Sequence, residues 1–258
     1  MTWVLTNLSL FSGAGGLDLG SKLVGGFKTV AYCEFDPYAQ GVLMSRMRSG
    51  ELDDAPIFED VRNIDGMRLR GSIDVISGGF PCQDISIVGK QEGIGGARSG
   101  LWKEYFRLIR DIRPNFVLVE NVAGILMGGA VGIVLGDLAS VGYDATWSCL
   151  SAAEVGAPHK RERFWLVAYP HGVGRDGLEE NKKKISPRIN TKGSSPWCNI
   201  PFDISLPMVE HDADPVPGIL RMDDGLAESV DGIRLCGNGV VPEQSTPAWQ
   251  KIKDLAQI

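Results

Sequence analysis

The sequence predicts an α/β protein in which a parallel sheet is covered by helices. Short apolar runs alternate with amphipathic stretches through the first two thirds of the chain, as in sheets whose strands are joined by crossover helices. A glycine-rich turn at 12–16 directly follows the first apolar run. The length of 258 residues, with 43% hydrophobic residues, is enough for one full domain and a modest appendage.

The expected elements follow one another in a regular order. Strands are expected over 5–11, 29–34, 74–79, 116–120, 144–150 and 164–168. Helices are expected over 17–23, 37–47, 101–113, 130–141 and 243–255. Pro37 suits the first turn of its helix, because an N–H at that position would have no partner within the helix.

The character of the chain changes after Tyr169. Residues 170–230 are rich in Pro, Gly, Ser, Asn and charge and show little periodicity, which indicates loops or a small irregular module. We therefore expect a main domain over 1–169, a small lobe over 170–230, and a C-terminal segment over 231–258 that returns to the main domain.

The bulk composition argues against several classes of protein. No apolar run is long enough to span a membrane, and the N-terminus lacks the basic start of a secretory signal, so a cytoplasmic protein is expected. The cysteines occur singly, without a CxxC pair, which favours free thiols in a reducing compartment over disulfides or a zinc site, and we expect no metal. These cysteines are Cys33, Cys82, Cys149, Cys198 and Cys236.

The charge distribution bears on a nucleic-acid partner. The net charge of −6 argues mildly against one, since phosphate contacts need Lys and Arg. Binding depends on where the basic residues lie, however, and here they gather in two places, 160–163 and 182–192. The second cluster is compatible with phosphate contacts and equally with a solvated loop.

The glycine-rich turn indicates a nucleoside site. Ligands bind open α/β sheets at the carboxyl ends of the strands, where glycines let the backbone approach closely and the next helix offers free N–H groups. The pattern FSGAGG alone is also compatible with a simple tight turn. Glu34 at the end of the second strand is placed to accept hydrogen bonds from ribose hydroxyls. Asp60 lies where a third strand could end, and could read an adenine amino group.

A second candidate site involves a cysteine. Cys82 follows a buried strand within Gly-Gly-Phe-Pro-Cys-Gln, at the edge where such sheets carry their active sites. A lone cysteine is commonly a structural thiol. Here Glu120 ends the next apolar strand, and Arg161 and Arg163 flank a strand that could border the same cleft. A thiol, a carboxyl group and cations at one edge predict covalent catalysis.

Seven segments of the chain carry a family resemblance. They are LSLFSGAGGLDLG, AYCEFD, EDVRNI, ISGGFPCQDIS, RSGLWKEYFRLIRDIRPNFVLVENV, APHKRERFWLVA and GNGVVP. In this order they resemble the cytosine-5 DNA methyltransferase family motif by motif, over residues 7–168 and from 234 to the end. The pairing of Pro-Cys-Gln with Glu-Asn-Val is highly specific to that family. Residues 170–230 lie outside the resemblance.

The resemblance implies a fold and a reaction. The implied fold is the Rossmann-like one of S-adenosylmethionine-dependent methyltransferases, a mixed sheet with helices on both faces, plus a small irregular target-recognition lobe. The implied reaction moves a methyl group from S-adenosylmethionine to C5 of a cytosine flipped out of DNA, leaving S-adenosylhomocysteine. Cys82 would add to C6, and Glu120 would hold the exocyclic amino group and the protonated N3. Arg163 would contact the O2 side, and Arg161 would support the site.

The resemblance also assigns binding residues and partners. The residues expected at the cofactor are Phe11, Gly13, Gly15, Glu34, Asp60, Pro81, Asn238 and Gly239. The residues expected to contact DNA are Gln83, Ser86, Lys182, Lys183, Lys184 and Arg188. The expected partner is double-stranded DNA. A bacterial enzyme with a cognate restriction endonuclease and an orphan or phage-encoded enzyme both remain open, and a monomer without membrane attachment is expected.

Two features depart from the family. His159 stands where the family commonly has Gln, but both arginines remain, so activity is expected. The segment 170–230 is about half as long as in larger members, and a small lobe buries little DNA surface, so we expect a short target.

Three other functions compete with this one. The same chemistry on cytosine in RNA occurs in a tRNA-directed branch of the family, and Cys82 with Glu120 does not distinguish the two; the basic lobe favours DNA. A catalytically silent relative would usually lack the nucleophile or the cofactor glycines, which are present here. An unrelated nucleotide-binding oxidoreductase would not carry Pro-Cys-Gln with Glu-Asn-Val.

Overall fold

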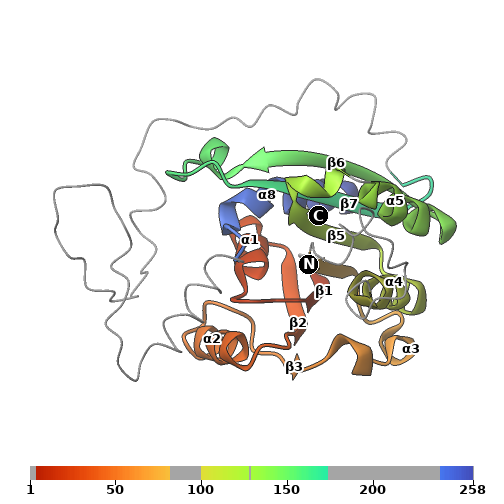
Figure 1. Cartoon of the computed structure of the whole chain (residues 1–258). Helices are drawn as coiled ribbons and strands as arrows, with labels where there is room; N and C mark the ends of the chain where they lie inside the picture. Colours follow the sequence, from red (N-terminus) through yellow and green to blue (C-terminus); the bar gives the residue numbers. More distant parts are fainter. Residues whose placement is uncertain (1–3, 82–99, 128, 174–238, 258) are drawn as a thin grey trace.

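A seven-stranded mixed sheet forms the centre of the molecule (Figure 1). The computed structural model describes residues 4–81, 100–127, 129–173 and 239–257. Across the sheet the strand order is β3-β2-β1-β4-β5-β7-β6. The strands are β1 (Leu5–Leu10), β2 (Phe27–Cys33), β3 (Ile57–Phe58), β4 (Val75–Gly79), β5 (Phe116–Val122), β6 (Tyr143–Ser151) and β7 (Glu162–Pro170).

The first five strands run parallel to one another, whereas β7 runs in the opposite direction. β1 pairs in parallel with β2 and β4, β2 with β3, and β4 with β5. β7 runs antiparallel to both β5 and β6. The wholly parallel sheet expected from the alternating pattern is therefore wrong for β7, whereas the mixed sheet implied by the resemblance is confirmed. Only ten residues, 152–161, join β6 to β7, and a return this short favours an antiparallel neighbour over a crossover.

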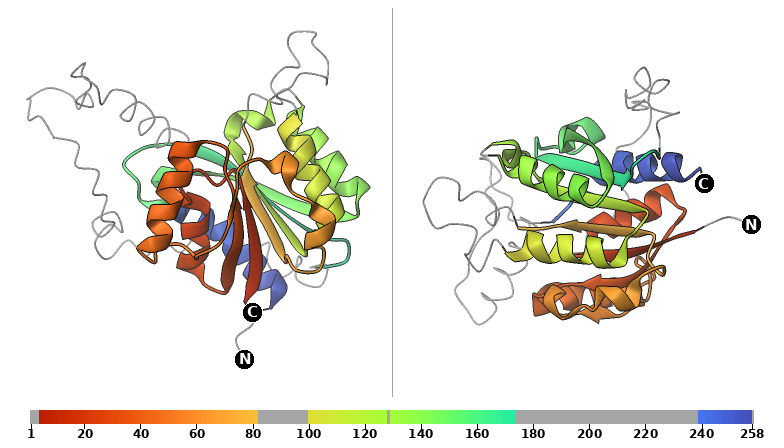
Figure 2. Two further views of the ribbon diagram at one scale, coloured as in Figure 1. Left: turned by 90° about the horizontal axis from the view of Figure 1, so that it is seen from below. Right: turned by 90° about the vertical axis from the view of Figure 1, so that its right-hand side faces the viewer.

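Helices cover both faces of the sheet, and Figure 2 shows the two groups on either side of the strands. The α-helices are α1 (Gly16–Val24), α2 (Pro37–Arg48), α3 (Gly66–Leu69), α4 (Gly100–Ile112), α5 (Ala130–Ser140) and α8 (Pro242–Ala256). In the described part of the chain, short 3₁₀ helices follow strands: η1 (Val61–Asn63), η3 (Ala123–Leu126) and η4 (Ala152–Val155). Helices α4 and α5 pack on one face, and α1 and α8 pack on the other.

The central strands supply both core layers through alternate side chains. In β5, Val117 and Val119 join the core under α4 and α5, while Leu118 joins the core under α1 and α8. Successive side chains of a strand point to opposite faces, so a strand buried on both faces reads as a continuous apolar run. This arrangement explains why the run at 116–119 was recognisable as a strand without any alternation of polar residues.

The C-terminal helix returns to the beginning of the chain. Trp249 of α8 is fully buried, its ring centroid lies 4.7 Å from that of Phe27, and its indole N–H donates to the carbonyl oxygen of Leu17 at 3.0 Å. Ser245 packs so closely on Gly20 of α1 that a Cβ on that glycine would collide with it. The two ends of the domain are thus held together across one face of the sheet.

A buried carboxylate lies under the first strands. Asp18 of α1 accepts hydrogen bonds from the Ser9 hydroxyl at 2.8 Å, the Thr29 hydroxyl at 2.9 Å and the Asn7 amide at 3.3 Å. Burial raises its pKa to about 6, although the hydroxyl hydrogen bonds oppose the shift. The carboxylate connects α1 to β1 and β2 beneath the glycine-rich turn.

We expect Asp18 to make the stability of the fold depend on pH. Because its folded pKa of about 6 exceeds the unfolded value, the folded state retains a proton that the unfolded state loses. The free energy of unfolding should therefore decrease by about 3 kcal/mol as pH rises from about 4 to about 6. Urea unfolding at several pH values should show this contribution in the wild type and not in Asp18→Asn. Asp254→Asn, on the exposed side of α8, is the control, and an equal pH dependence in all three proteins would contradict the assignment.

The expected elements agree with the structure to within a few residues, except at β3. That strand has two residues, and Asp60 lies two positions beyond its end. The expected lobe at 170–230 falls almost entirely outside the described residues, so the division into 1–169, 170–230 and 231–258 stays a prediction. Among the residues described, no helix is long and apolar enough to cross a membrane.

Candidate active site

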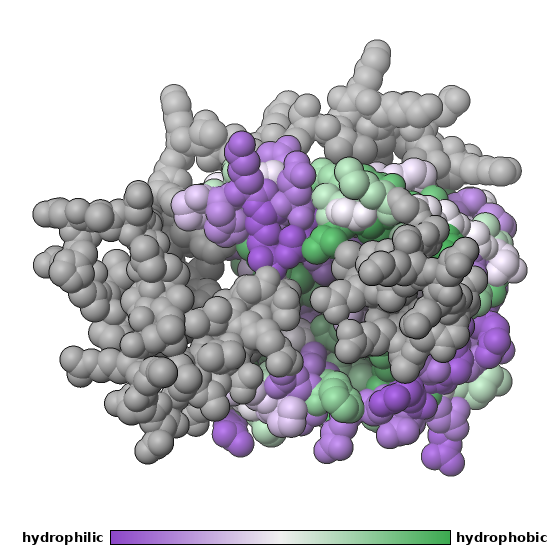
Figure 3. Space-filling model, in the orientation of Figure 1, coloured by the Kyte–Doolittle hydropathy of each residue, from purple (hydrophilic) through white to green (hydrophobic). Residues whose placement is uncertain are grey.

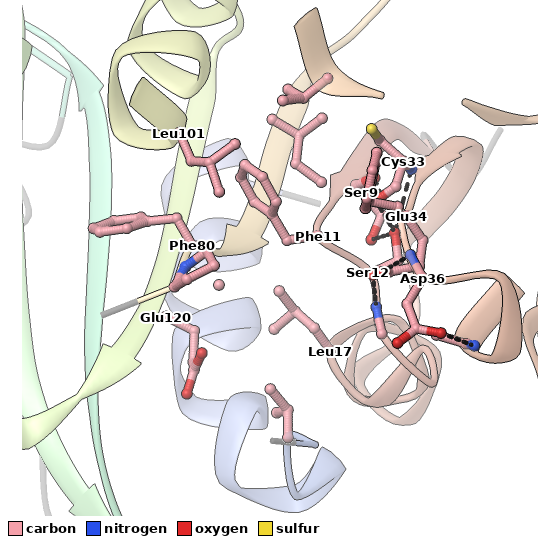
Figure 4. A pocket seen from close by; sticks show the side chains of 18 of the residues that line it. Ser9, Phe11, Ser12, Leu17, Cys33, Glu34, Asp36, Phe80, Leu101 and Glu120 are labelled. Atoms are coloured by element: carbon pink, nitrogen blue, oxygen red, sulfur yellow. Dashed lines mark hydrogen bonds between the residues drawn. The ribbon is translucent and has the colours of Figure 1, made fainter. Parts of the chain in front are cut away.

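A cavity of about 740 Å³ opens at the carboxyl ends of the parallel strands. Figure 4 shows Glu34 on one side of it and Glu120 on the other, with Phe11 and Leu17 between them and Leu101 and Phe80 nearby. The walls come from the turn after β1, the ends of β2, β4 and β5, and the segment before α8. β1 and β4 are neighbours in the sheet, and the chain continues from β1 toward one edge of the sheet and from β4 toward the other. The connections diverge at this point and leave a crevice between them, as in other doubly wound sheets.

The glycine-rich turn is built from backbone conformations that few residues adopt. Gly13 and Gly15 have φ of +54° and +77°, and Phe11, which lines the cavity, has φ of +52°. A bulky residue in this left-handed region is strained, and such strain persists where the surroundings impose it. The turn brings the N-terminus of α1, whose first residue Gly16 lines the cavity, to the cavity wall.

Glu34 holds the turn in place through its carboxylate. One oxygen accepts the N–H of Gly13 at 2.7 Å, and the other accepts the N–H of Asp36 at 2.9 Å. The side chain is half-buried and lines the cavity. Each carboxylate oxygen can accept more than one hydrogen bond, so the same group can also receive hydroxyl donors from a ligand.

Asp60 lines the cavity on the side of β2 and β3. Its carboxylate makes a bidentate ion pair with Arg62, with the closest approach at 2.6 Å, and the hydrogen bond to that guanidinium holds the pKa of Asp60 below its usual value. The segment around η1, directly after Asp60, is held by α4, because Arg107 donates to the carbonyl oxygens of Val61 and Ile64, each at 3.0 Å. Arg62 also lines the cavity, and neither arginine was predicted as a site residue from the sequence.

The opposite end of the cavity contains a buried ion pair. The Arg163 guanidinium lies 2.9 Å from a carboxylate oxygen of Glu120, and both side chains are nearly buried. Burial raises the pKa of Glu120 to about 7, while the charges of Arg163 and Arg161 act in the opposite direction. A Cβ on Gly79 of β4 would collide with the Glu120 carboxylate, so a larger residue there would have to displace that carboxylate. This end of the cavity can therefore hold a carboxyl group that gains or loses a proton near neutral pH.

The segment before Cys82 is held against β5. Asn121 is buried, and its side-chain Nδ2 donates to the carbonyl oxygen of Phe80 at 3.0 Å, while its side-chain Oδ1 accepts the N–H of Val122 at 2.9 Å. Pro81 lines the cavity directly after that anchored peptide. Cys82 lies outside the described residues, but the residue before it, Pro81, lines the same cavity as Glu120.

Arg161 joins the end of β7 to the C-terminal segment. Its guanidinium donates to the carbonyl oxygen of Gly239 at 2.6 Å, and burial together with the nearby charge of Arg163 lowers its pKa. Gly239 and Val240 both line the cavity. The carbonyl of Val240 would collide with a Cβ on Gly16, which explains the glycine at the start of α1.

Of the site residues predicted from the sequence, most of those that the structure describes come together at the cavity. The described ones that line the cavity are Phe11, Gly13, Glu34, Asp60, Pro81, Glu120, Arg163 and Gly239. Arg161 reaches the wall through Gly239, whereas Gly15 packs against Leu43 and Leu52 behind the turn and does not line the cavity. Cys82, Gln83, Ser86, Lys182, Lys183, Lys184, Arg188 and Asn238 lie outside the described residues.

The surface beside the cavity has a hydrophilic part and an apolar part. On the face seen in Figure 1, Figure 3 shows hydrophilic surface over the segment between η4 and β7, next to apolar surface over η3. His159 and Lys160 are exposed in the first segment, and Leu126 and Met127, 50% and 81% exposed, belong to or follow η3. His159, which replaces the Gln common in the resembling family, is thus an exposed residue, whereas Glu120 is buried.

Comparison with known proteins agrees with this geometry. The family model for C-5 cytosine-specific DNA methylases matches residues 5–197. The type II methyltransferase M2.BsuMI of Bacillus subtilis is 37% identical over 168 residues, which are 62% of this chain and 41% of that protein. The orphan methyltransferase M.SPRI of Bacillus phage SPR is 29% identical over 62% of this chain and 36% of its own length. The chain thus spans less than half the length of these relatives.

Solved structures share the fold. A crystal structure described as that of a prophage-encoded DNA modification methyltransferase from E. coli has a TM-score of 0.52 and 29% identity, over 64% of this chain and 47% of that one. The DNMT2 of Spodoptera frugiperda has a TM-score of 0.56 at 18% identity, over 66% of this chain and 51% of that one, which is a likeness of fold alone. Since the family model matches most of the chain, the protein belongs to the C-5 cytosine-specific DNA methylase family.

Proposed function

We propose that the protein is a DNA cytosine-5 methyltransferase, which moves a methyl group from S-adenosylmethionine to C5 of a flipped-out cytosine. The main support for this proposal is that one cavity is lined by both sets of predicted site residues. Glu34 and the turn at Gly13 lie at one end of it, while Glu120, Arg163 and the anchored peptide before Cys82 lie at the other. A nucleoside site and an acid–base site within one cavity suit a transfer between a nucleoside cofactor and a base.

The charge of the cavity lining supports S-adenosylmethionine as the cofactor. Its lining includes more carboxylates than cations, which favours a ligand that carries a sulfonium charge. The carboxylates are those of Glu34, Asp36, Glu59, Asp60 and Glu120, against the guanidinium groups of Arg62 and Arg163. Glu34 would accept the ribose hydroxyls, Asp60 the adenine amino group, and Phe11 would contact the adenine ring. When bound, the cofactor supplies an electrophilic methyl group.

The residues at the other end would activate the cytosine. The Cys82 thiolate would form a bond to C6, which makes C5 nucleophilic and leaves negative charge at N3 and O2. Glu120 in its protonated form would place a proton at N3, and Arg163 would stabilise the O2 side. After C5 gains the methyl group, a base removes the C5 proton, the bond between Cys82 and C6 breaks, and the N3 proton returns to the Glu120 carboxylate. These steps restore the aromatic ring, the free thiolate and the protonated carboxyl group. No metal takes part.

The substrate and the cellular context belong to the same proposal. Double-stranded DNA is the proposed partner, contacted by Gln83 and Ser86 near the nucleophile and by the basic residues of the lobe: Lys182, Lys183, Lys184 and Arg188. Phosphate contacts of this kind position the duplex and do not read its sequence. We propose a monomer that acts in the cytoplasm of a bacterium, with or without a cognate restriction endonuclease.

Single-base methylation sequencing tests the proposal directly. Plasmid DNA from a methylation-free host that expresses the wild type should contain 5-methylcytosine in one sequence context, and DNA from the Cys82→Ser strain should contain none. Unmodified DNA with both proteins would contradict DNA as the substrate. In that case 5-methylcytosine in the tRNA of the same cells, again only with the wild type, would indicate the RNA-directed activity.

Glu34→Ala should weaken cofactor binding. Removal of the carboxylate takes away the proposed ribose acceptor and releases the N–H groups of Gly13 and Asp36. We expect the Kd for S-adenosylhomocysteine to rise by about 10- to 100-fold, which corresponds to about 1.4–2.8 kcal/mol. Calorimetry measures this change. Asp54→Ala, at an exposed carboxylate after α2, is the control, and an unchanged affinity in Glu34→Ala would remove Glu34 from the ribose site.

A further inference from the structure

Gln244 is a fully buried polar side chain in the first turn of α8. Its amide nitrogen donates to two backbone carbonyl oxygens, that of Leu150 at 2.6 Å and that of Arg161 at 2.7 Å. Leu150 lies near the end of β6, and Arg161 directly precedes β7. One amide group therefore bridges two antiparallel strands at the point where their ladder ends.

This bridge holds the backbone that carries the two active-site arginines. The carbonyl oxygen of Arg161 also accepts the N–H of Ala152 at 3.1 Å, so two donors determine its position. Arg163 follows two residues later, and its guanidinium lies 2.9 Å from the Glu120 carboxylate. A displacement of the Arg161 peptide would therefore move Arg163 relative to Glu120.

Arg161 is also held by the segment that lines the cofactor end of the cavity. The Arg161 guanidinium donates to the carbonyl oxygen of Gly239 at 2.6 Å, and Gly239 and Val240 line the cavity beside Gly16. The segment 239–244 thus binds Arg161 twice, through its side chain and through its backbone carbonyl. Gln244 itself does not line the cavity.

We propose that Gln244 is a positioning residue, which fixes the Arg161–Arg163 segment of the base site relative to the C-terminal wall of the cofactor site. The proposal rests on the proposed methyltransferase function, because its readouts are those of that reaction. Gln244 acts through Arg161 and Arg163 and touches neither substrate nor cofactor. Loss of its two donors leaves the Leu150 carbonyl without this buried partner and allows the strand end to shift.

The test compares one substitution at two positions of the same helix. Gln244→Met keeps the side-chain length and removes both donors, whereas Gln250→Met changes an exposed residue whose amide donates to Asp254. We expect kcat to fall by about 10- to 100-fold in Gln244→Met, since small displacements of catalytic groups have large effects, while the Kd for S-adenosylhomocysteine stays within about threefold. Gln250→Met should match the wild type in both.

A pH profile separates positioning from a loss of stability. Arg163 lowers the pKa of Glu120 against the effect of burial, so a looser contact should raise that pKa. The basic limb of kcat/KM should therefore move to higher pH in Gln244→Met and not in Gln250→Met. If Gln244→Met does not fold, Gln244→His, which keeps one ring N–H donor, should show the same lowered kcat and shifted limb to a smaller extent.

The outcomes distinguish this inference from the proposed function. If the wild type methylates neither DNA nor tRNA, the proposed function fails first. If the wild type is active and the folded Gln244 variant has the wild-type kcat and pH profile, the positioning role is wrong even if its Tm is lower. A variant that loses cofactor affinity with an unchanged kcat would equally overturn it.

Discussion

Cys82→Ser is expected to lose DNA methylation completely in single-turnover assays while binding the cofactor as the wild type does. A serine hydroxyl has no anionic form near neutral pH, so it cannot add to C6 as a thiolate does. The preceding residue, Pro81, lines the cavity, and the peptide before it is anchored by Asn121. The cofactor contacts proposed for Glu34 and Gly13 lie at the other end of the cavity and should be unaffected.

The measurement has a chemical and a binding part. Transfer of a labelled methyl group to duplex DNA gives the rate, and calorimetry with S-adenosylhomocysteine gives the affinity. Cys149→Ser, at an exposed cysteine of β6, is the matched control and should retain full activity. Substantial methylation by Cys82→Ser would mean that another group is the nucleophile.

Glu120→Gln should give the second large effect, a fall in kcat/KM of about 10²- to 10⁴-fold. The amide keeps the shape and hydrogen-bonding capacity of the side chain but cannot transfer a proton to N3. It also leaves Arg163 without the opposite charge that lies 2.9 Å away in the wild type. Glu162→Gln, the same change at an exposed neighbouring position, should have little effect.

The pH dependence of kcat/KM tests whether Glu120 is the group that supplies the proton. Burial raises the pKa of Glu120 to about 7, so the free enzyme carries the protonated carboxyl below that pH and loses it above. Because the protonated form is the one that acts, kcat/KM of the wild type should fall as pH rises through about 7. This basic limb should be absent from Glu120→Gln. If both proteins keep the same limb, a group other than Glu120 supplies the proton.

Much of the site was predictable because its signals are local. The turn FSGAGG, the acid that ends β2, and the cysteine after β4 each lie at the end of an apolar run. Carboxyl ends of parallel strands meet at one edge, so these residues could be placed together before any distance was known. The roles of Arg107 and Asn121 could not be predicted in this way, because each side chain donates to a backbone carbonyl oxygen about 40 residues away, and the fold alone brings the two together. Asn121 did stand within Glu-Asn-Val, but nothing in that triplet indicates that its amide holds the Phe80 peptide.

The sequence by itself determined the order of strands and helices, the edge of the sheet that carries the site, and the family motifs, because these depend on apolar periodicity and on residue types at short spacing. Only the tertiary structure decided the direction of β7, the return of α8 onto α1, and the pairing of Glu120 with Arg163. These features join residues tens to hundreds of positions apart, and their energies depend on burial. The carboxyl of Glu120 titrates near neutral pH because the folded chain removes it from water and places two cations beside it, and that balance exists only once the strands are packed.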